Sequence, residues 1–515
     1  MQSQDQVIFD AFFDQVQRFP KKVALIVEGE LIDYTTLLQR VRELETILLQ
    51  SEVKKSPIAV ISENGFLLPV AALLASKTNQ TIVPIASGLR PKQLQALIEV
   101  AKPALVIMTK LTSATSNFLK EFPERDFSIL EVGGATDLRV IRFFEPNKTL
   151  TPKLEQTAPS FVMNFTSGST GAPKPVCISQ VTKLDRIFAG TATLFGITSR
   201  DITLVSTPQY HSLGFRQTLV PLLTGGTGVI LPKFSVEGWI DAVENHQVTF
   251  SIGVSSQLSR VVTNLDETSI SRLASLSTLV SSSAAFSPAQ RAICRRVLQC
   301  RIFECYGASE IGIATTLEIC QQDSHHQNVG FAPDYAEVCI FEENNKKVHA
   351  SVGSVGEIGV KSQLAFTHYH ELPDITEQSF VNEFFLTGDL GYLSDSGELF
   401  LVGRAKDTIQ NSGITVYPSD IEQCCKSISG VLDACAVGMS DRLGHEKIGL
   451  LIVASDCLSN NQILRHLMGE LAPWQVPTKI SRAKKIPLTE IGKVDRHAVT
   501  KRILDELETG HEKSN

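Results

Sequence analysis

The stretch Thr166-Ser-Gly-Ser-Thr-Gly-Ala-Pro-Lys174 decides how the rest of the chain is interpreted. It lies between two apolar segments, FVMNF and PVCIS, so we expect a loop that joins two strands. Gly168 and Gly171 allow successive backbone N–H groups to point inward as an anion-binding nest. Further hydrogen-bond donors in the loop are the side chains of Ser167, Ser169, Thr170 and Lys174. The sequence therefore predicts a loop that binds a triphosphate.

This loop is not of the Walker A type. The chain lacks GxxxxGK[ST] here, and a strand rather than a helix follows the loop. The alternative interpretation is a polar turn that is merely rich in Ser, Thr and Gly. Two glycines, several hydroxyls and a lysine in one short stretch favour the phosphate loop over that turn.

Apolar runs and helical patterns alternate on both sides of the loop. Val- and Ile-rich runs occur at 23–27, 56–62, 104–108, 202–206, 228–231, 248–254 and 276–282. Between them lie helical patterns such as 34–49 and 91–99. This alternation predicts an α/β fold with stacked, mostly parallel sheets and helices up to about residue 330.

The pattern changes in the last third of the chain. Short strands separated by Gly, Asn and Asp turns predict a small β-barrel-like subdomain over about 330–403. The residues after Gly403 are typical of a compact α+β unit, with a strand over 413–417, a helix over 419–428 and strands over 431–439 and 448–455.

Length and composition set the class of protein. A chain of 515 residues is longer than a domain with a single hydrophobic core, so we expect several structural units. Apolar residues make up 43% and charged residues 20%, which is ordinary for a globular protein. The net charge of −7 and the lack of a basic run argue against a general nucleic-acid or anionic-membrane binder.

The N-terminus and the cysteines predict a cytoplasmic protein. The first residues carry acids where a signal peptide needs Lys or Arg, and Ile8, Phe9, Phe12, Phe13 and Val16 mark one face of a helix. The longest apolar run, 66–75, is about half of what a membrane span needs. Ten scattered cysteines without a CxxC pair indicate reduced thiols, with adjacent Cys424 and Cys425 on different faces of a helix.

Beyond the loop, five more motifs occur in a fixed order, and with them the chain resembles the AMP-forming adenylating enzymes. That superfamily includes acyl-CoA synthetases, adenylation domains of non-ribosomal peptide synthetases and luciferases. The motifs are PQYHSLG (208–214), YGASE (306–310), TGD (387–389), GRAKD (403–407) and LTEIGKVDR (488–496). Weaker similarities occur at 31–37, 83–85 and 471–477. The resemblance covers essentially the whole chain and is nearest in pattern to acyl- or aryl-CoA ligases.

The resemblance implies a division into domains. Residues 1–403 would form the large adenylate-forming domain, and residues 408–515 a small, mobile C-terminal domain. The hinge would be 404–407, where Lys406 takes the family's hinge position and a few backbone torsions swing the small domain.

It also implies roles at the nucleotide. Glu310 would hold Mg²⁺ on ATP, because a hard carboxylate suits that ion. Asp389 would accept hydrogen bonds from both ribose hydroxyls, and Arg404 would also contact the nucleotide. The other implied nucleotide residues are those of the phosphate loop and of the two sides of the adenine site: Thr166, Ser167, Gly168, Ser169, Thr170, Gly171, Lys174, Ser283, Ala284, Ala285, Tyr306, Gly307 and Ser309.

Lys493 is the residue that the resemblance implies for catalysis. Its ammonium group would sit between the substrate carboxylate and the α-phosphate and offset the charge that develops there. Rotation about Lys406 would then withdraw Lys493. Gly413, which has no side chain, would leave room for a pantetheine arm in the thiol channel.

The acid pocket is expected to include His211, Phe215, Ser255 and Ala308. For His211 the alternative is a packed histidine at a helix start. Amino-acid-activating members carry an FDxS-like segment whose aspartate pairs with the substrate amine, whereas PQYHSLGFRQT has no acid. An unpaired ammonium is costly there, so we expect an aliphatic or aromatic carboxylic acid without an α-amino group.

The expected reaction converts the acid and MgATP into acyl-AMP and pyrophosphate, and then transfers the acyl group to a thiol. CoA is the expected thiol, and the alternative is the phosphopantetheine arm of a carrier protein acting in trans. A remote alternative is a non-catalytic regulator that binds a nucleotide or acyl ligand.

The chain departs from the family pattern at four places. SSSAAF (281–286) replaces a glycine-containing stretch beside the adenine, and Ser309 replaces Thr but keeps the hydroxyl. Asp420 replaces Glu, and Asn79 replaces a frequent Gly. Asn tolerates a left-handed backbone better than most residues, so we expect the last change to be mild.

Overall fold

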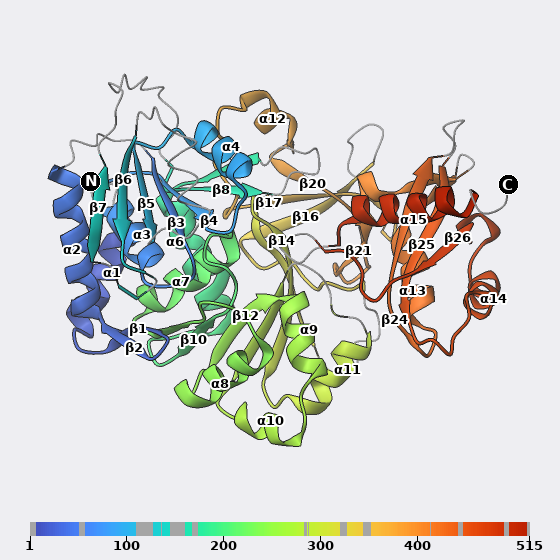
Figure 1. The fold of residues 1–515 in the computed structure, drawn as a ribbon, viewed down its shortest axis with the longest axis horizontal. Helices are drawn as coiled ribbons and strands as arrows, with labels where there is room; N and C mark the ends of the chain where they lie inside the picture. The colour runs from blue at the N-terminus through green and yellow to red at the C-terminus, as the bar shows by residue number, and fades with distance from the viewer. Residues whose placement is uncertain are drawn as a thin grey trace. The chain divides into compact units, whose positions relative to one another are not determined.

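The structure is a computed structural model, and it describes residues 7–50, 57–109, 127–134, 136–137, 139–144, 160–166, 174–282, 286, 288–319, 327–342, 352–411, 414–440, 446–488 and 494–511. Figure 1 shows the order of the helices and strands. The chain divides into two compact units, Met1–Glu337 with Val360–Phe385, and Val338–Gly359 with Leu386–Asn515.

The first large sheet of unit 1 has eight strands in the order β15-β14-β13-β12-β10-β11-β1-β2. Its inner pairs are parallel, and antiparallel pairs close both edges. The strands are β1 (Val23–Val27), β2 (Glu30–Asp33), β10 (Ile202–Val205), β11 (Thr227–Ile230), β12 (Phe250–Val254), β13 (Thr278–Ser282), β14 (Arg301–Ala308) and β15 (Gly312–Glu318).

The second sheet of unit 1 also has eight strands, in the order β18-β9-β8-β4-β3-β5-β6-β7. Its central strands are parallel, and every residue of β3 is buried, as expected of a strand covered on both faces. The strands are β3 (Ile58–Ser62), β4 (Ile82–Ala86), β5 (Leu105–Thr109), β6 (Ser128–Val132), β7 (Val140–Phe144), β8 (Val162–Thr166), β9 (Lys174–Ile178) and β18 (His368–Tyr369).

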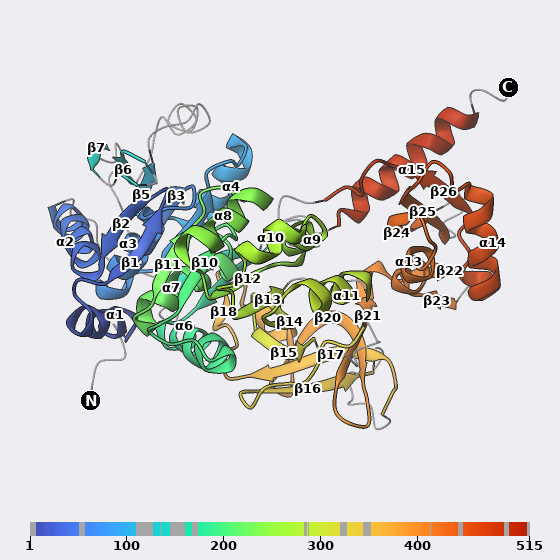
Figure 2. The same ribbon diagram turned by 90° about the horizontal axis from the view of Figure 1, so that it is seen from below.

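Four helices form a layer between these sheets. Helix α3 (Leu67–Lys77) packs on β3 and β4, whereas α7 (Ser212–Thr224) packs on β10 and β11. Helices α1 (Val7–Arg18) and α6 (Gln180–Ile187) contact each other, and each also contacts α7. Figure 2 shows α6 beside α7. Both α3 and α7 are apolar over most of their surface, as expected for helices enclosed by two sheets.

The remaining helices of unit 1 complete the outer layers. On the first sheet, Trp239 and Leu258 belong to the buried cluster that packs α8 and α9 against the strands. On the second, Leu94 and Ile98 of α4 pack against strand residues. The outer helices are α2 (Tyr34–Gln50), α4 (Pro91–Ala101), α8 (Val236–His246), α9 (Ser255–Thr263), α10 (Glu267–Arg272), α11 (Pro288–Val297) and α12 (Pro373–Gln378).

A five-stranded sheet forms in the region where a small β subdomain was predicted. Its path is β16-β17-β20-β19, and β21 pairs with β20. The pairs β19–β20 and β20–β21 are antiparallel. The strands are β16 (Ala336–Phe341), β17 (Gly356–Ser362), β19 (Phe380–Val381), β20 (Phe384–Leu393) and β21 (Leu399–Arg404).

The C-terminal α+β part is built on a three-stranded sheet, β24-β25-β26. Alternate residues of β24 face opposite sides: Ala434 and Ala436 join one core cluster, and Cys435 and Val437 join the other. Its elements are β22 (Ile409–Asn411), β23 (Ile414–Val416), α13 (Pro418–Lys426), β24 (Val431–Ser440), β25 (Glu446–Ala454), α14 (Asn460–Glu470), β26 (Lys479–Arg482) and α15 (Arg496–His511).

Several local predictions are confirmed. The N-terminal helix buries Ile8, Phe9, Phe12 and Val16 on one face, whereas Phe13, the fifth residue predicted for that face, is half-buried. Asn79 has a φ of 51°, the left-handed conformation that made Asn a mild replacement for Gly. Each cysteine in the described ranges is a free thiol, and Cys425 is buried while Cys424 is half-buried.

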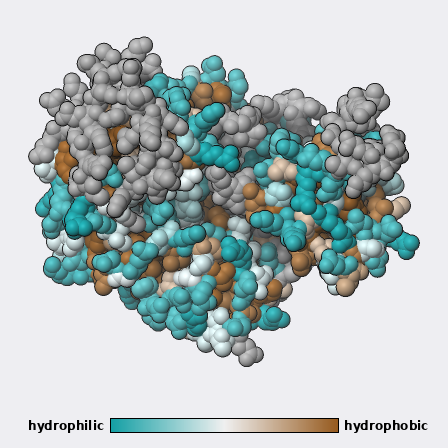
Figure 3. Space-filling view, in the orientation of Figure 1, coloured by the Kyte–Doolittle hydropathy of each residue, from teal (hydrophilic) through white to brown (hydrophobic). Residues whose placement is uncertain are grey.

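The hydropathy of the surface is that of an ordinary globular protein, as the composition predicts. Among the described residues, no helix is long and apolar enough to cross a membrane. The face in Figure 3 is mostly hydrophilic, with hydrophobic residues interspersed.

Candidate active site

The motifs of unit 1 gather at the carboxyl ends of parallel strands. Residues Val254 and Ser282 pair at the ends of β12 and β13, and Ser282 pairs with Cys305 of β14. Ser255 directly follows β12, and PQYHSLG follows β10 after a short turn. Ligands of open α/β sheets bind at this edge of the sheet, so the topology supports the position of the predicted site.

The ends of the phosphate loop are held by a strand pair. Thr166 of β8 lies opposite Lys174 of β9, and the Thr166 hydroxyl donates to the Lys174 carbonyl at 3.3 Å. The predicted loop residues between them, Ser167, Gly168, Ser169, Thr170 and Gly171, lie outside the described residues. The predicted strand–loop–strand arrangement is thus present at both ends.

Glu310, the predicted Mg²⁺ ligand, lies beside the end of that loop. The Tyr369 hydroxyl of β18 donates to Glu310 Oε1 at 2.9 Å. Lys174 Nζ lies 5.1 Å from the centroid of the Tyr369 ring, within cation–π range. Tyr369 therefore connects two motifs that are more than a hundred residues apart in sequence.

A buried arginine fixes the backbone around Glu310. The Arg186 guanidinium of α6 donates to the carbonyl oxygens of Ser309, Glu310 and Leu364, each at 2.8 Å. Burial, and next the charge of Arg216, lower the pKa of Arg186 to about 9, while the charge of Glu310 opposes this shift. Because three carbonyl dipoles face the guanidinium, Arg186 anchors the turn that carries Glu310, the predicted metal ligand.

Tyr306 and Gly307, predicted for the adenine site, occupy the end of β14. Tyr306 is 9% exposed. A Cβ at Gly307 would lie 2.0 Å from the Gly312 carbonyl oxygen, so this close approach of β14 and β15 requires glycine. The other predicted side of that site, Ser283, Ala284 and Ala285, lies outside the described residues.

The predicted pocket residues differ in burial. His211 is the N-cap residue of α7, with its ring 4.4 Å from that of Tyr210, and it is half-buried. Phe215 is only 1% exposed and packs against Phe161. Ser255 is buried at the start of α9, and Ala308 is half-buried at the end of β14.

Unit 2 holds the remaining predicted residues. Asp389 and Arg404 pair across β20 and β21, and Arg404 Nε lies 2.6 Å from Asp389 Oδ1. Lys406 lies in the short 3₁₀ helix Ala405–Asp407. Lys493 and Gly413 lie outside the described residues, although Leu488 and Val494, which flank Lys493 in sequence, form an antiparallel bridge.

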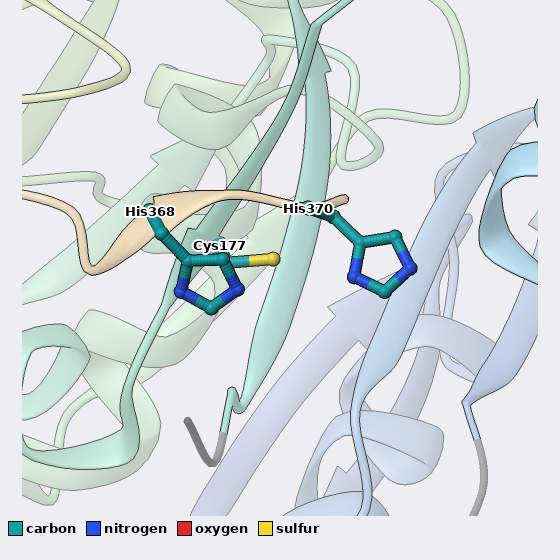
Figure 4. A group of neighbouring side chains, drawn as sticks. All are labelled: Cys177, His368 and His370. Atoms are coloured by element: carbon teal, nitrogen blue, oxygen red, sulfur yellow. The ribbon is translucent and has the colours of Figure 1, made fainter. Parts of the chain in front are cut away.

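Cys177, His368 and His370 form a cluster next to Tyr369 (Figure 4). Their donor atoms lie within 4.8 Å of one another. Burial raises the pKa of the Cys177 thiol to about 11. Sulfur and imidazole donors suit zinc, whereas Mg²⁺ takes oxygen ligands, so this cluster does not replace Glu310 as the predicted Mg²⁺ ligand.

Sequence reasoning missed Tyr369 and Arg186. Tyr369 belongs to a two-residue strand in FTHYHELP, which carries no recognisable motif. Arg186 lies in a helix that is polar by composition, so its burial at 2% exposure was not visible in the sequence. Only the tertiary packing brings either side chain to Glu310.

The chain is similar to known proteins over nearly its whole length. A curated long-chain-fatty-acid–CoA ligase of Salmonella typhimurium is 21% identical, over 95% of this chain and 93% of that protein. A 2-succinylbenzoate–CoA ligase of Bacillus velezensis is 24% identical, over 96% of this chain and 97% of that protein. The ATP-bound structure of MatB from Rhodopseudomonas palustris has a TM-score of 0.85 at 20% identity, covering 97% of this chain and 99% of that one.

The sequence profile of the AMP-binding enzymes matches residues 12–370, and that of the AMP-binding enzyme C-terminal domain matches residues 420–493. Together the two profiles span both the strand edge that carries Glu310 and the C-terminal α+β part. The chain belongs to the AMP-binding enzyme family.

Proposed function

We propose that the protein is an acid–thiol ligase that uses ATP to activate a carboxylic acid without an α-amino group and then transfers the acyl group to CoA. In the first half-reaction a carboxylate oxygen attacks the α-phosphorus of ATP, which forms acyl-AMP and releases pyrophosphate. In the second, a thiol attacks the acyl carbonyl carbon, the thioester forms, AMP leaves and the thiol proton passes to solvent.

The observation that carries this proposal is the approach of the phosphate loop and Glu310. Lys174 ends the loop, and its ammonium faces the ring whose hydroxyl binds Glu310. Tyr369 therefore contacts both groups: the Lys174 ammonium, a cation for phosphate oxygens, lies over its ring, and the Glu310 carboxylate, a ligand for a divalent ion, accepts from its hydroxyl. This arrangement is what a triphosphate with bound Mg²⁺ requires.

The residues fit Mg²⁺. Glu310 is half-buried and offers a hard oxygen donor, and Arg186 and Tyr369 fix its backbone and its side chain. When bound, the ion would neutralise charge on the phosphate oxygens. In this proposal Thr166, Lys174 and the loop residues 167–171 bind phosphates, Tyr306 and Gly307 lie against adenine, and Asp389 and Arg404 bind the ribose.

The remaining steps are assigned to unit 2 by the same proposal. Lys493 would offset the charge that develops between the carboxylate and the α-phosphate. Motion at Lys406 would then exchange Lys493 for Gly413 and admit the thiol. The small and polar residues of the acid pocket would be His211, Ser255 and Ala308.

The proposal of a substrate without an α-amino group rests on the charges of the segment 208–218. The segment 208–218 carries no acid, and the structure adds that Arg216 of this segment is buried. A substrate ammonium near this segment would lack a counterion, which is unfavourable in a buried pocket.

The test is ATP–pyrophosphate exchange measured with a panel of fatty, dicarboxylic, benzoic, cinnamic and amino acids. We expect exchange that depends on added acid and on Mg²⁺, and no exchange with the amino acids. Product formation with CoA is then compared with loading of a phosphopantetheinylated carrier protein. Exchange with none of the acids contradicts the proposed function, and faster loading of the carrier protein contradicts the choice of CoA.

A further inference from the structure

Three basic side chains are buried together between α6 and α7. Lys183 is fully buried, Arg186 is 2% exposed and Arg216 is 6% exposed. The charge of Arg216 acts on both Lys183 and Arg186 and lowers the pKa of each, after the larger effect of burial. Figure 2 shows the two helices side by side. Buried cations are costly unless they are paired, so each of the three needs an explanation.

Contacts within the chain account for the burial of Arg186 and Lys183. Arg186 donates to three carbonyl oxygens. Lys183 Nζ lies 4.6 Å from the centroid of the Phe215 ring, and burial lowers the pKa of this amine well below its ordinary value. A buried lysine, unlike an arginine, can lower the cost of its burial by losing its proton.

Arg216 is different. Among the residues that the structure describes, it forms no hydrogen bond and no ion pair. A guanidinium has five N–H donors and keeps its charge in proteins, so it cannot escape by deprotonation. The nearby Tyr335 hydroxyl also lacks a hydrogen-bond partner among the described residues. A buried guanidinium and a buried hydroxyl without a partner in the described part of the chain have the chemistry to bind an anion, and the charges of Arg216 and Tyr335 act on each other.

Arg216 and the predicted adenine-binding residue Tyr306 lie on opposite faces of the sheet. The charge of Arg216 acts on Cys305 and Tyr335. Cys305 and Tyr306 are neighbours in β14, so their side chains point to opposite faces of the sheet. Arg216 therefore lies on the face away from the predicted adenine-binding ring, and on the same helix as the predicted pocket residue Phe215.

We propose that Arg216 and the Tyr335 hydroxyl bind a second carboxylate of the acid substrate, so that the substrate is a dicarboxylic acid. This inference rests on the proposed function. One carboxylate of the acid is adenylated at the nucleotide, and the other is held by the guanidinium at the far end of the acid pocket. Binding of an ATP phosphate by Arg216 is disfavoured because Arg216 and Tyr306 lie on opposite sides of β14.

The experiment compares matched acids in ATP–pyrophosphate exchange. Each α,ω-dicarboxylic acid from malonic to suberic acid is paired with the monocarboxylic acid in which a methyl group replaces the far carboxylate. Isophthalic acid is paired with 3-methylbenzoic acid. The full-length protein is compared with Arg216→Met, Arg216→Lys, Tyr335→Phe and a control, Arg200→Met, which removes an exposed arginine of the same unit.

We expect the unmodified protein to prefer one dicarboxylic acid to its partner by about 100-fold or more in kcat/KM. Arg216→Met should remove that preference, Arg216→Lys should restore part of it, and Tyr335→Phe should weaken it about tenfold. Arg200→Met should leave it unchanged. Thermal unfolding of each variant separates a selective loss from a failure to fold.

Three outcomes overturn the inference. The first is a preference of the unmodified protein for the monocarboxylic partners, which leaves the proposed function intact. The second is a rise in KM for ATP in Arg216→Met that is equal for all acids, which assigns Arg216 to the nucleotide. The third is a preference that survives in Arg216→Met. Absence of exchange with every acid instead contradicts the proposed function itself.

Discussion

Replacing Tyr369 by Phe tests whether the contact with Glu310 organises the proposed Mg²⁺ site. The variant removes only the hydroxyl that donates to Glu310 Oε1 at 2.9 Å. It keeps the ring that Lys174 Nζ faces at 5.1 Å, so the packing at the end of the phosphate loop is preserved. The effect therefore reports on the Tyr369 hydroxyl alone.

The magnitude follows from the kind of bond. Tyr369 is 3% exposed, and its acceptor is a carboxylate. A hydrogen bond to a charged group contributes about 1.5–3 kcal/mol, and about 1.4 kcal/mol corresponds to a factor of ten. We expect kcat/KM for MgATP to fall by about 10- to 100-fold, and the Mg²⁺ concentration that gives half-maximal exchange to rise.

The assay is ATP–pyrophosphate exchange at saturating acid, with Mg²⁺ varied. Burial, and next the charge of Glu310, raise the pKa of Tyr369 above its ordinary value, so its hydroxyl stays protonated throughout the assay range. The loss should consequently be the same between about pH 6 and pH 9. Tyr392→Phe is the control, because among the described residues this tyrosine stacks on Phe400 and forms no hydrogen bond. An unchanged Mg²⁺ dependence in Tyr369→Phe refutes the assignment of Glu310 as the metal ligand.

Three further substitutions follow from the packing. Arg186→Met leaves one buried and two half-buried carbonyl groups without their donor, and it should lower the free energy of unfolding by about 3–5 kcal/mol in urea titration. A loss below about 1 kcal/mol would contradict the anchoring role. Gly307→Ala places a Cβ 2.0 Å from the Gly312 carbonyl, so its midpoint of thermal unfolding should fall by several degrees, whereas Gly134→Ala, which meets open space, should leave it unchanged. Arg496→Met breaks ion pairs to Glu422 and Asp407 and should cost about 2 kcal/mol, measured as earlier proteolysis within the C-terminal part; unchanged protection would show that these pairs do not stabilise it.

Much of the fold was predictable because its signals are local. The buried runs at 23–27 and 58–62 form strands, and the helical pattern at 34–49 forms a helix that ends one residue later. Fully apolar strands and periodic helices carry their structure in consecutive residues. The two strands that flank the phosphate loop were predictable for the same reason.

The contacts that build the site were less predictable. The bond from Tyr369 to Glu310 and the anchoring of that turn by Arg186 join segments far apart in the chain. Nothing in the segment PQYHSLGFRQT indicates that Arg216 is buried, whereas the structure places it between two sheets. Sequence patterns indicate which residues have the right chemistry, but burial and unpaired charge depend on tertiary packing.

The most direct test of the proposed function uses Lys493→Ala in two half-reactions. Acid-dependent ATP–pyrophosphate exchange should be strong in the unmodified protein and fall at least about 100-fold in the variant. Thioester formation from preformed acyl-AMP and CoA should survive much better, because the proposed mechanism withdraws Lys493 before that step. Full exchange activity in Lys493→Ala, or exchange that needs no added acid, would contradict the account.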